Sequence, residues 1–317
     1  MQAYGAHRFS GIISANSISG GKGMSRIYTD LAMESGRVGA GEQVEGVRIA
    51  RSESGGVTRL RVDVLNERGE RETGKRPGAY VTLYSDGLDD MGGDEWSVLT
   101  DMLAGEISAL AGLDEVQEAG VLVLGLGNRQ VTPDAIGPRV ADMVLSTRAL
   151  QDEAGIPGLR RVMTAAPGVY GATGIEVEEV VKGLVRELRP GAIIAIDALC
   201  ARDPGRIANT IQLSDAGIQP GSGVGNHRAA LSRDTLGVRV AAIGVPTVVY
   251  ARSIVADALE RAGAQSDGRL ADAAEDMIVA PRSIDSLVER ASRLIADALN
   301  RALQPELTSE DLRWLTV

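Results

Sequence analysis

Two aspartates stand just after apolar, strand-like segments of this sequence, at positions where carboxylates can do chemistry. Asp197 directly follows the apolar run 192–196, and Asp134 ends a glycine-rich turn that leaves the run 121–124. An aspartate anion is costly to bury unless it is paired, bound to a metal or protonated. Two neighbouring carboxylates that share one proton can polarise a water molecule and protonate a leaving amine. We therefore expect Asp134 and Asp197 to be the catalytic pair of a hydrolytic site.

Two glycine-rich turns are the candidate substrate-binding loops. Glycine lets another backbone approach closely, and backbone amides in such turns can donate to a developing oxyanion. The alternative is that these glycines only form turns. A dinucleotide fingerprint does not fit the first turn, because its third glycine would fall on Gln130. The candidates for contact with substrate are Gly125, Gly127, Asn128, Gly221, Gly223, Gly225 and Asn226.

Two other kinds of site use some of the same residues. Cys200 and His227 could form a nucleophile with its base, but cysteine is commonly a small buried hydrophobic residue, so we do not favour this scheme. Asp134, Asp197 and His227 could instead bind a metal. A site built from several histidines is excluded, because the sequence has only two histidines. We expect neither a metal nor another cofactor.

The spacing of apolar residues predicts an α/β fold that brings the two aspartates together. Short apolar runs at 121–124, 192–196 and 238–243 alternate with helical periodicity at 177–188 and 284–299. This alternation is typical of βα units, with a twisted, mostly parallel sheet flanked by helices. Ligands of such sheets bind at the carboxyl ends of the strands. We therefore expect both aspartates at one edge of the sheet.

The N-terminal part of the chain has a different pattern. Apolar and polar residues alternate from 57 to 84 around a turn-like stretch at 66–69, which predicts a small antiparallel β unit at about 44–85. Residues 1–24 are rich in glycine and serine without a sustained period, and we interpret them as a mobile leader or pro-segment. Residues 25–317 are then expected to form one α/β domain.

Composition narrows the possible partners and the compartment. The 317 residues carry a net charge of −10 and only 3% aromatic residues, which argues against direct binding of nucleic acid. No run approaches the about 18 apolar residues of a membrane span, so no membrane contact is expected. The single cysteine excludes an intrachain disulfide and favours the reducing cytoplasm.

Several motifs resemble the germination proteases of endospore-forming bacteria. They include the residues around both aspartates, and a weaker likeness extends from Thr29-Asp30-Leu31-Ala32 to about Leu303. The motifs that carry the resemblance lie at 124–128, 131–138, 166–176, 194–199, 209–218, 220–226 and 243–249.

This resemblance implies more than the residues do by themselves. It implies a fold like that of the hydrogenase maturation endopeptidases, catalysis by Asp134 and Asp197, and small acid-soluble spore proteins as substrates. It also implies a homotetramer in the spore core that arises from a zymogen by autocatalytic processing. Two alternatives remain open: a metal-dependent maturation peptidase of the same fold, and an inactive homologue that binds spore proteins without cutting them.

Overall fold

One sheet runs through the whole described part of the protein. The computed structural model describes residues 29–34, 38, 44–85, 87–88, 91–116, 118–207, 209–221, 229–263 and 277–315. The strand order is β1-β2-β3-β7-β8-β6-β4-β5, and β9 pairs with β8. The strands are β1 (Val47–Ser54), β2 (Val57–Val64), β3 (Gly78–Tyr84), β4 (Val121–Gly125), β5 (Val162–Ala165), β6 (Ala192–Ala201), β7 (Thr210–Ser214), β8 (Arg239–Tyr250) and β9 (Ile278–Val279).

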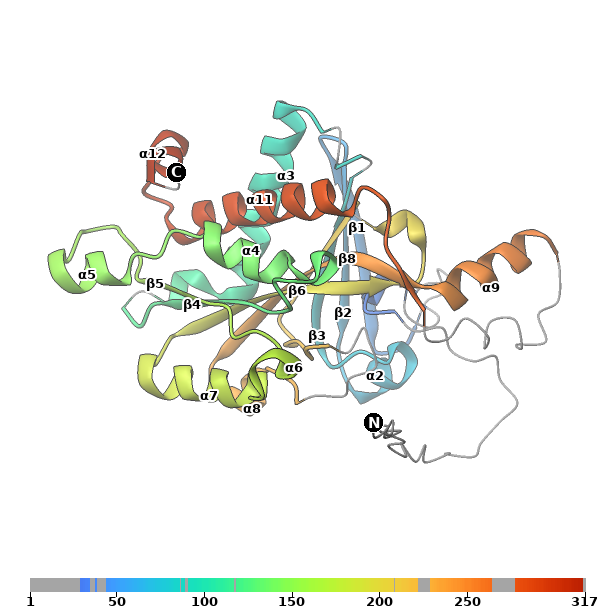
Figure 1. The fold of residues 1–317 in the computed structure, drawn as a ribbon, viewed down its shortest axis with the longest axis horizontal. Coiled ribbons are helices and arrows are strands. Elements are labelled where there is room, and N and C mark those ends of the chain that lie inside the picture. Colours follow the sequence, from blue (N-terminus) through green and yellow to red (C-terminus); the bar gives the residue numbers. More distant parts are fainter. Residues whose placement is uncertain are drawn as a thin grey trace, which may run out of the picture.

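Helices flank the sheet on both faces, as the sequence predicts for the α/β class. Figure 1 shows α4 and α11 on one side of β4 and β6, and α7 and α8 on the other. The α-helices are α2 (Glu67–Thr73), α3 (Gly93–Ala111), α4 (Ile136–Met143), α5 (Arg148–Ala154), α6 (Tyr170–Thr173), α7 (Val177–Leu188), α8 (Arg233–Leu236), α9 (Ala251–Arg261), α11 (Ile284–Leu303) and α12 (Ser309–Leu315). The 3-10 turns are η1 (Ala32–Glu34), η2 (Leu113–Glu115), η3 (Thr132–Asp134) and η4 (Pro204–Arg206).

The sheet is mixed, which corrects the expectation of a mostly parallel one. β5, β4, β6 and β8 run parallel to one another. The pairs β1–β2, β2–β3, β3–β7, β7–β8 and β8–β9 are antiparallel. The reason is that β7 lies between the N-terminal strands and β8 and is antiparallel to both of its neighbours. The predicted antiparallel unit near the N-terminus is confirmed, and it continues the same sheet rather than forming a separate one.

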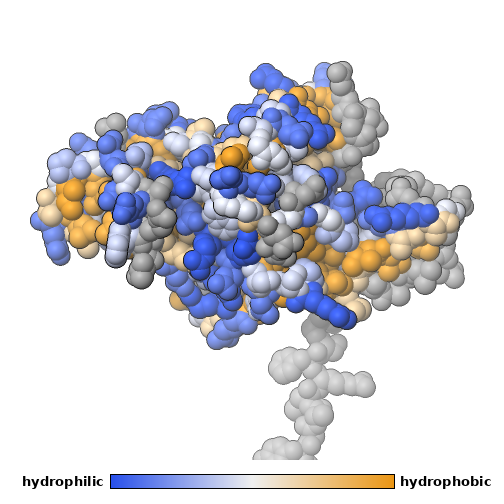
Figure 2. Space-filling view, turned by 90° about the horizontal axis from the view of Figure 1, so that it is seen from above, coloured by the Kyte–Doolittle hydropathy of each residue, from blue (hydrophilic) through white to orange (hydrophobic). Residues whose placement is uncertain are grey.

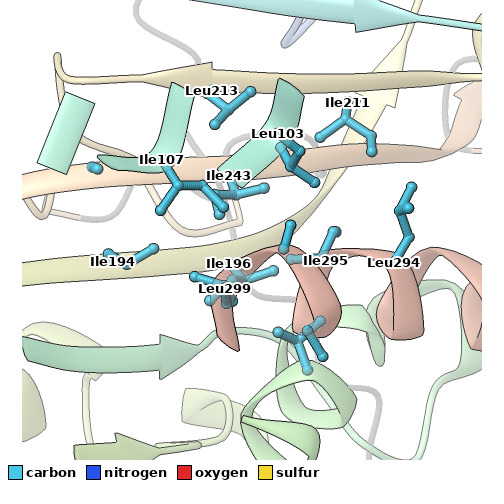
Figure 3. Close-up of a cluster of buried hydrophobic side chains, with 14 of the residues drawn as sticks. Leu103, Ile107, Ile194, Ile196, Ile211, Leu213, Ile243, Leu294, Ile295 and Leu299 are labelled. Carbon is cyan, nitrogen blue, oxygen red and sulfur yellow. The ribbon is translucent and has the colours of Figure 1, made fainter. Parts of the chain in front are cut away.

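The larger core lies between the sheet and the helices α3, α4 and α11. Figure 3 shows Ile196 of β6 next to Leu299 of α11, and Ile194 further along the same strand, with Ile107 of α3 on the other side of β6 in this view. A second cluster lies under α7 and includes Ile193 and Ala195 of β6. Because successive residues of a strand point to opposite faces, β6 supplies both cores and is buried except at the half-buried Ala198. The strand that carries Asp197 is therefore held firmly from both sides.

Local sequence signals explain most of the helix boundaries. Helices at 177–188 and 284–299 are confirmed as α7 and α11, and α11 runs on to Leu303. The turn expected at 66–69 is wrong, because this stretch begins α2. Asn66 caps that helix: its side-chain oxygen accepts hydrogen bonds from the backbone N–H groups of Arg68 and Gly69.

The surface matches the acidic, polar composition. Viewed from above the orientation of Figure 1, hydrophilic residues cover much of the face that Figure 2 shows, with apolar residues in smaller groups. Within the described ranges, none of the helices is both long enough and apolar enough to cross a lipid bilayer. The expected leader at 1–24 lies outside the described residues.

Candidate active site

Asp197 lies within β6, one residue beyond the last pair that β6 forms with β4. That last pair joins Ile196 to Gly125, and the N–H of Leu126 then donates to the carbonyl of Ile196 at 2.8 Å. The expectation that Asp197 ends its strand is wrong, because β6 goes on pairing with β8 as far as Ala201. Its neighbour β4 does end here, so Asp197 occupies the edge at which a parallel sheet opens.

The turn after β4 folds back and places Asp134 over the end of that strand. Asp134 is the last residue of η3, and its carboxyl Oδ2 accepts the backbone N–H of Asn128 at 2.8 Å. Gly127 has a φ of +108°, and a Cβ there would lie 2.1 Å from the carbonyl oxygen of Asp134. Only glycine fits this contact without a shift of the backbone. The turn therefore fixes both the main chain and the carboxyl of Asp134.

Burial and like charge act together on Asp197. Asp197 is only 6% exposed, and burial raises the pKa of its carboxyl well above the usual range. The charge of Asp134 raises the pKa further, and Asp30 adds to the effect. Backbone N–H groups of Ala198, at 2.9 Å from Oδ1, and of Gly221 lower the pKa but do not reverse it. Of the two carboxyls, Asp197 therefore holds its proton to the higher pH.

Asp134 is the more accessible member and the better site for the negative charge. Burial raises the pKa of its carboxyl, and the hydrogen bond from the N–H of Asn128 opposes the change. Asp134 is half-buried, whereas Asp197 is buried. Both carboxyls have raised pKa values, and that of Asp197 is raised more strongly. Two neighbouring carboxyls with different pKa values can serve as an acid and a base.

The predicted substrate-binding residues fall into three groups. Gly125 is buried, and a Cβ there would lie 2.1 Å from the carbonyl oxygen of Gly137, so it allows α4 to pack against β4. Gly127 and Asn128 form the turn that holds Asp134, and Gly221 presents its N–H to Asp197. Their contact with substrate stays a prediction. Gly223, Gly225 and Asn226 lie outside the described residues, as does His227.

The alternative sites receive little support from the described residues. No group of three or more His, Cys, Asp or Glu residues in these ranges has an arrangement suited to a metal ion. Cys200 is buried, and burial, followed by the charge of Asp30, raises the pKa of its thiol to about 12. A thiol that stays protonated at neutral pH is a poor nucleophile. The metal site that would include His227 remains a hypothesis.

Sequence reasoning did not identify Asp30 as part of this region. Its carboxyl Oδ2 accepts the backbone N–H of Cys200 at 2.8 Å, three residues past Asp197 on the same strand. No hydrophobic period surrounds Asp30, and 167 residues separate it from Asp197, so only the motif Thr29-Asp30-Leu31-Ala32 marked it. The pairing of this segment with β6 is a tertiary contact without a local signal.

Comparisons with known proteins agree on one family. A family model described as germination protease matches residues 28–262. The germination protease of Caldanaerobacter subterraneus subsp. tengcongensis is 37% identical in an alignment 318 positions long, gaps included, and the alignment covers 91% of this chain and 98% of that protein. The germination protease of Clostridium acetobutylicum is 34% identical with the same two coverages. That of Bacillus subtilis is 43% identical over 244 residues, 74% of this chain and 66% of the relative.

Among solved structures, a NiFe hydrogenase maturation protease from Thermococcus kodakarensis is similar over 59% of this chain and 98% of its own. The sequence identity is 18% and the TM-score is 0.32. A likeness at this level carries no argument about the site.

Proposed function

The chain belongs to the germination protease family, and from this premise we propose that it is an endopeptidase in which Asp134 and Asp197 activate water. The observation that carries this proposal is that a buried carboxyl and a half-buried one lie close enough for the charge of Asp134 to raise the pKa of Asp197. An acid and a base with different proton affinities at one edge of a sheet suit the hydrolysis of an amide.

The proposed reaction restores both aspartates at the end of each cycle. Asp134 removes a proton from water as the water oxygen attacks the peptide carbonyl carbon, and Asp197 gives its proton to the carbonyl oxygen. The tetrahedral intermediate that forms is neutral. Asp134 then passes its proton to the amide nitrogen, the C–N bond breaks, and Asp197 recovers a proton from the hydroxyl group. Neither a metal nor a covalent intermediate is needed in this sequence.

We propose that backbone groups of the two glycine-rich turns hold the substrate beside the carboxyls. The N–H groups of Asn128 and Gly221 already point at Asp134 and Asp197, respectively. Gly125 and Gly127 have packing roles of their own, and substrate contact would be a second use of the same turn. Gly223, Gly225 and Asn226 are proposed to complete the substrate site.

The substrate and assembly are proposed from the family resemblance. We expect small acid-soluble spore proteins to be cut in the spore core at the start of germination. We also expect a homotetramer whose N-terminal leader is removed by the enzyme itself. Light scattering coupled to size-exclusion chromatography measures the assembly, and a monomer would contradict that part of the proposal.

The decisive experiment compares Asp134→Asn and Asp197→Asn with the wild type on a purified small acid-soluble spore protein. Both variants should fold normally and lose cleavage, with fragments identified by mass spectrometry. Asp152→Asn is the matched control: Asp152 lies on α5, is well exposed and forms ion pairs with Arg148 and Arg161, so it should cut normally. Near-normal turnover by either site variant would refute the catalytic pair.

Two further outcomes separate the alternatives. Loss of activity in the presence of a chelator, with recovery on adding a divalent metal, would favour the metal-dependent peptidase. Binding of the spore protein by the wild type without any fragments would favour the inactive homologue.

A further inference from the structure

The segment Thr29–Glu34 is held by hydrogen bonds to the main chain at the end of the strand that carries Asp197. The N–H of Asp30 donates to the carbonyl of Cys200 at 3.0 Å, and the N–H of Cys200 donates back to the Asp30 carboxyl at 2.8 Å. The carboxyl of Glu34 accepts the N–H groups of Arg202 and Asp203 at 2.9 and 3.1 Å. Asp30 therefore closes a ring of two hydrogen bonds with a single residue of β6.

Side chains from two other elements hold the segment from behind. The ammonium group of Lys75, which follows α2, donates to the carbonyls of Thr29 and Asp30 at 3.1 and 3.0 Å. The amide of Gln212 on β7 accepts the N–H of Ala32 at 2.6 Å and donates to the carbonyl of Asp30 at 3.2 Å. Gln212 is buried and Lys75 is half-buried, so water does not easily replace the bonds of Gln212.

The point of attachment lies at an irregularity of β6. The pairing of β6 with β8 shifts register between Leu199 and Cys200, and such bulges re-aim neighbouring side chains. Leu31 packs with Leu199 in one small buried cluster. A Cβ on Gly244, the β8 partner of Asp197, would lie 2.4 Å from the Leu199 side chain. The position of Asp197 is thus linked through Leu199 to the bound segment.

We propose that Asp30 is a positioning residue for Asp197: its carboxyl fixes the irregular end of β6 and holds a second negative charge near the catalytic pair. The inference rests on the proposed function for its catalytic meaning. In the proposed reaction, Asp30 touches no reacting atom. It acts through the Cys200 main chain and through its charge.

The electrostatic part of the proposal concerns a small set of charged groups around Asp30 and Asp197. Among the described residues, the charges of Asp134 on η3 and of Asp30 act on the Asp197 carboxyl, and both raise its pKa. Around Asp30 lie Lys75, whose pKa burial lowers, and Cys200. The charge of Glu34 raises the pKa values of Lys75 and Cys200, and the charge of Arg252 lowers those of Cys200 and Tyr250. Tyr250 has a raised pKa, chiefly through burial.

Two substitutions separate the geometric role from the charge. Asp30→Asn keeps an oxygen that can accept the Cys200 N–H but removes the charge, whereas Asp30→Ala removes both. We expect Asp30→Asn to retain kcat at acidic pH, with the alkaline limb of the kcat/KM profile displaced to lower pH. Asp30→Ala should lose about 10²-fold in kcat with little change in KM, the loss expected for a catalytic group displaced by about 1 Å.

A second readout does not depend on activity. The Asp197 carboxyl carbon can be followed by NMR in protein labelled at the aspartate carboxyls, with its signal assigned by its absence in Asp197→Asn. It should titrate at lower pH in Asp30→Asn than in the wild type. Asp203→Asn is the matched control: it removes one carboxyl charge just past β6, its Oδ1 accepts the nearby N–H of Gly205, and its charge is not among those that raise the pKa of Asp197, so the titration should stay in place.

The outcomes are distinguishable. An unchanged Asp197 titration in Asp30→Asn, or equal kcat losses in the Asn and Ala variants, would overturn the proposal. If Asp30→Ala does not fold, the Asn variant decides by the same titration. A wild type that cleaves no peptide would refute the proposed function, and the NMR titration would still test the influence of Asp30 on Asp197.

Discussion

Replacing Gly127 with alanine tests how the turn after β4 positions Asp134. A Cβ at this residue would lie 2.1 Å from the carbonyl oxygen of Asp134 and 3.0 Å from its Oδ1. Real Cβ atoms essentially never approach closer than 3.0 Å, so the turn must open by about 0.9 Å. The φ of +108° adds backbone strain, because L-residues rarely adopt it.

Both terms can be given magnitudes. Strain at such a backbone angle costs about 1 to 3 kcal/mol. Forcing extra atoms into a well-packed site costs about 1 to 3 kcal/mol more. We therefore expect Gly127→Ala to lower the free energy of unfolding by about 2 to 6 kcal/mol. A displacement of Asp134 by nearly 1 Å should reduce kcat by about 10²-fold where the variant is folded.

Gly155→Ala is the matched control. Gly155 also has a positive φ, +56°, but a Cβ there meets nothing within 4 Å, and the residue caps α5 away from the site. It should cost about 1 to 2 kcal/mol and leave cleavage unchanged. Denaturant unfolding and cleavage of a spore protein measure the two effects. If Gly127→Ala matched Gly155→Ala in both stability and kcat, the turn would not be positioning Asp134.

Three other predictions follow from the pKa directions and from burial. The plot of kcat/KM against pH should be bell-shaped. Activity should fall at low pH as Asp134 gains a proton and at high pH as Asp197 loses one. A plot that stays flat across the raised pKa of Asp197 would contradict the proposed roles. Asp197→Asn should gain stability relative to the wild type as pH rises. A carboxyl whose pKa is raised by folding stabilises the wild type fully below the unfolded pKa, and this stabilisation is lost as pH rises through the folded pKa. Unfolding measured at pH 4 and pH 8 checks the sign. Cys200→Ala should keep cleavage, and iodoacetamide should label Cys200 in native protein only slowly at pH 8, since the pKa of the thiol is about 12; rapid labelling would refute its burial.

The strands and helices that frame the site could be predicted because their signals are local. The apolar runs 121–124 and 192–196 appear as β4 and the first half of β6, and helical periods mark α7 and α11. Apolar content is enough here because these strands are buried on both faces. Asn66 shows the limit of local sequence signals. Asparagine favours both turns and helix N-caps, and the structure shows that Asn66 is the N-cap of α2.

The features that sequence could not supply depend on contacts between distant segments. β6 extends past Asp197 because it continues to pair with β8, and no local signal in the sequence of β6 predicts this pairing. The mixed sheet follows from the insertion of β7 between β3 and β8. Asp30 reaches β6 by hydrogen bonds from its main chain and carboxyl to Cys200, and hydrophobic periodicity does not report such bonds.

We propose that the two aspartates have different roles because of the register of β4 and β6. β4 stops at Gly125, opposite Ile196, so the next residue of β6 keeps β8 beside it but loses a strand neighbour on the other side. Asp197 therefore stays buried in a strand while its carboxyl borders the turn that replaces β4. Asp134, carried by that turn, keeps more contact with water. Because a charge is less costly where water can reach it, we propose that Asp197 holds the proton and Asp134 the charge. A chain in which β4 ran two residues further would bury both carboxyls alike and remove the difference that an acid and a base require.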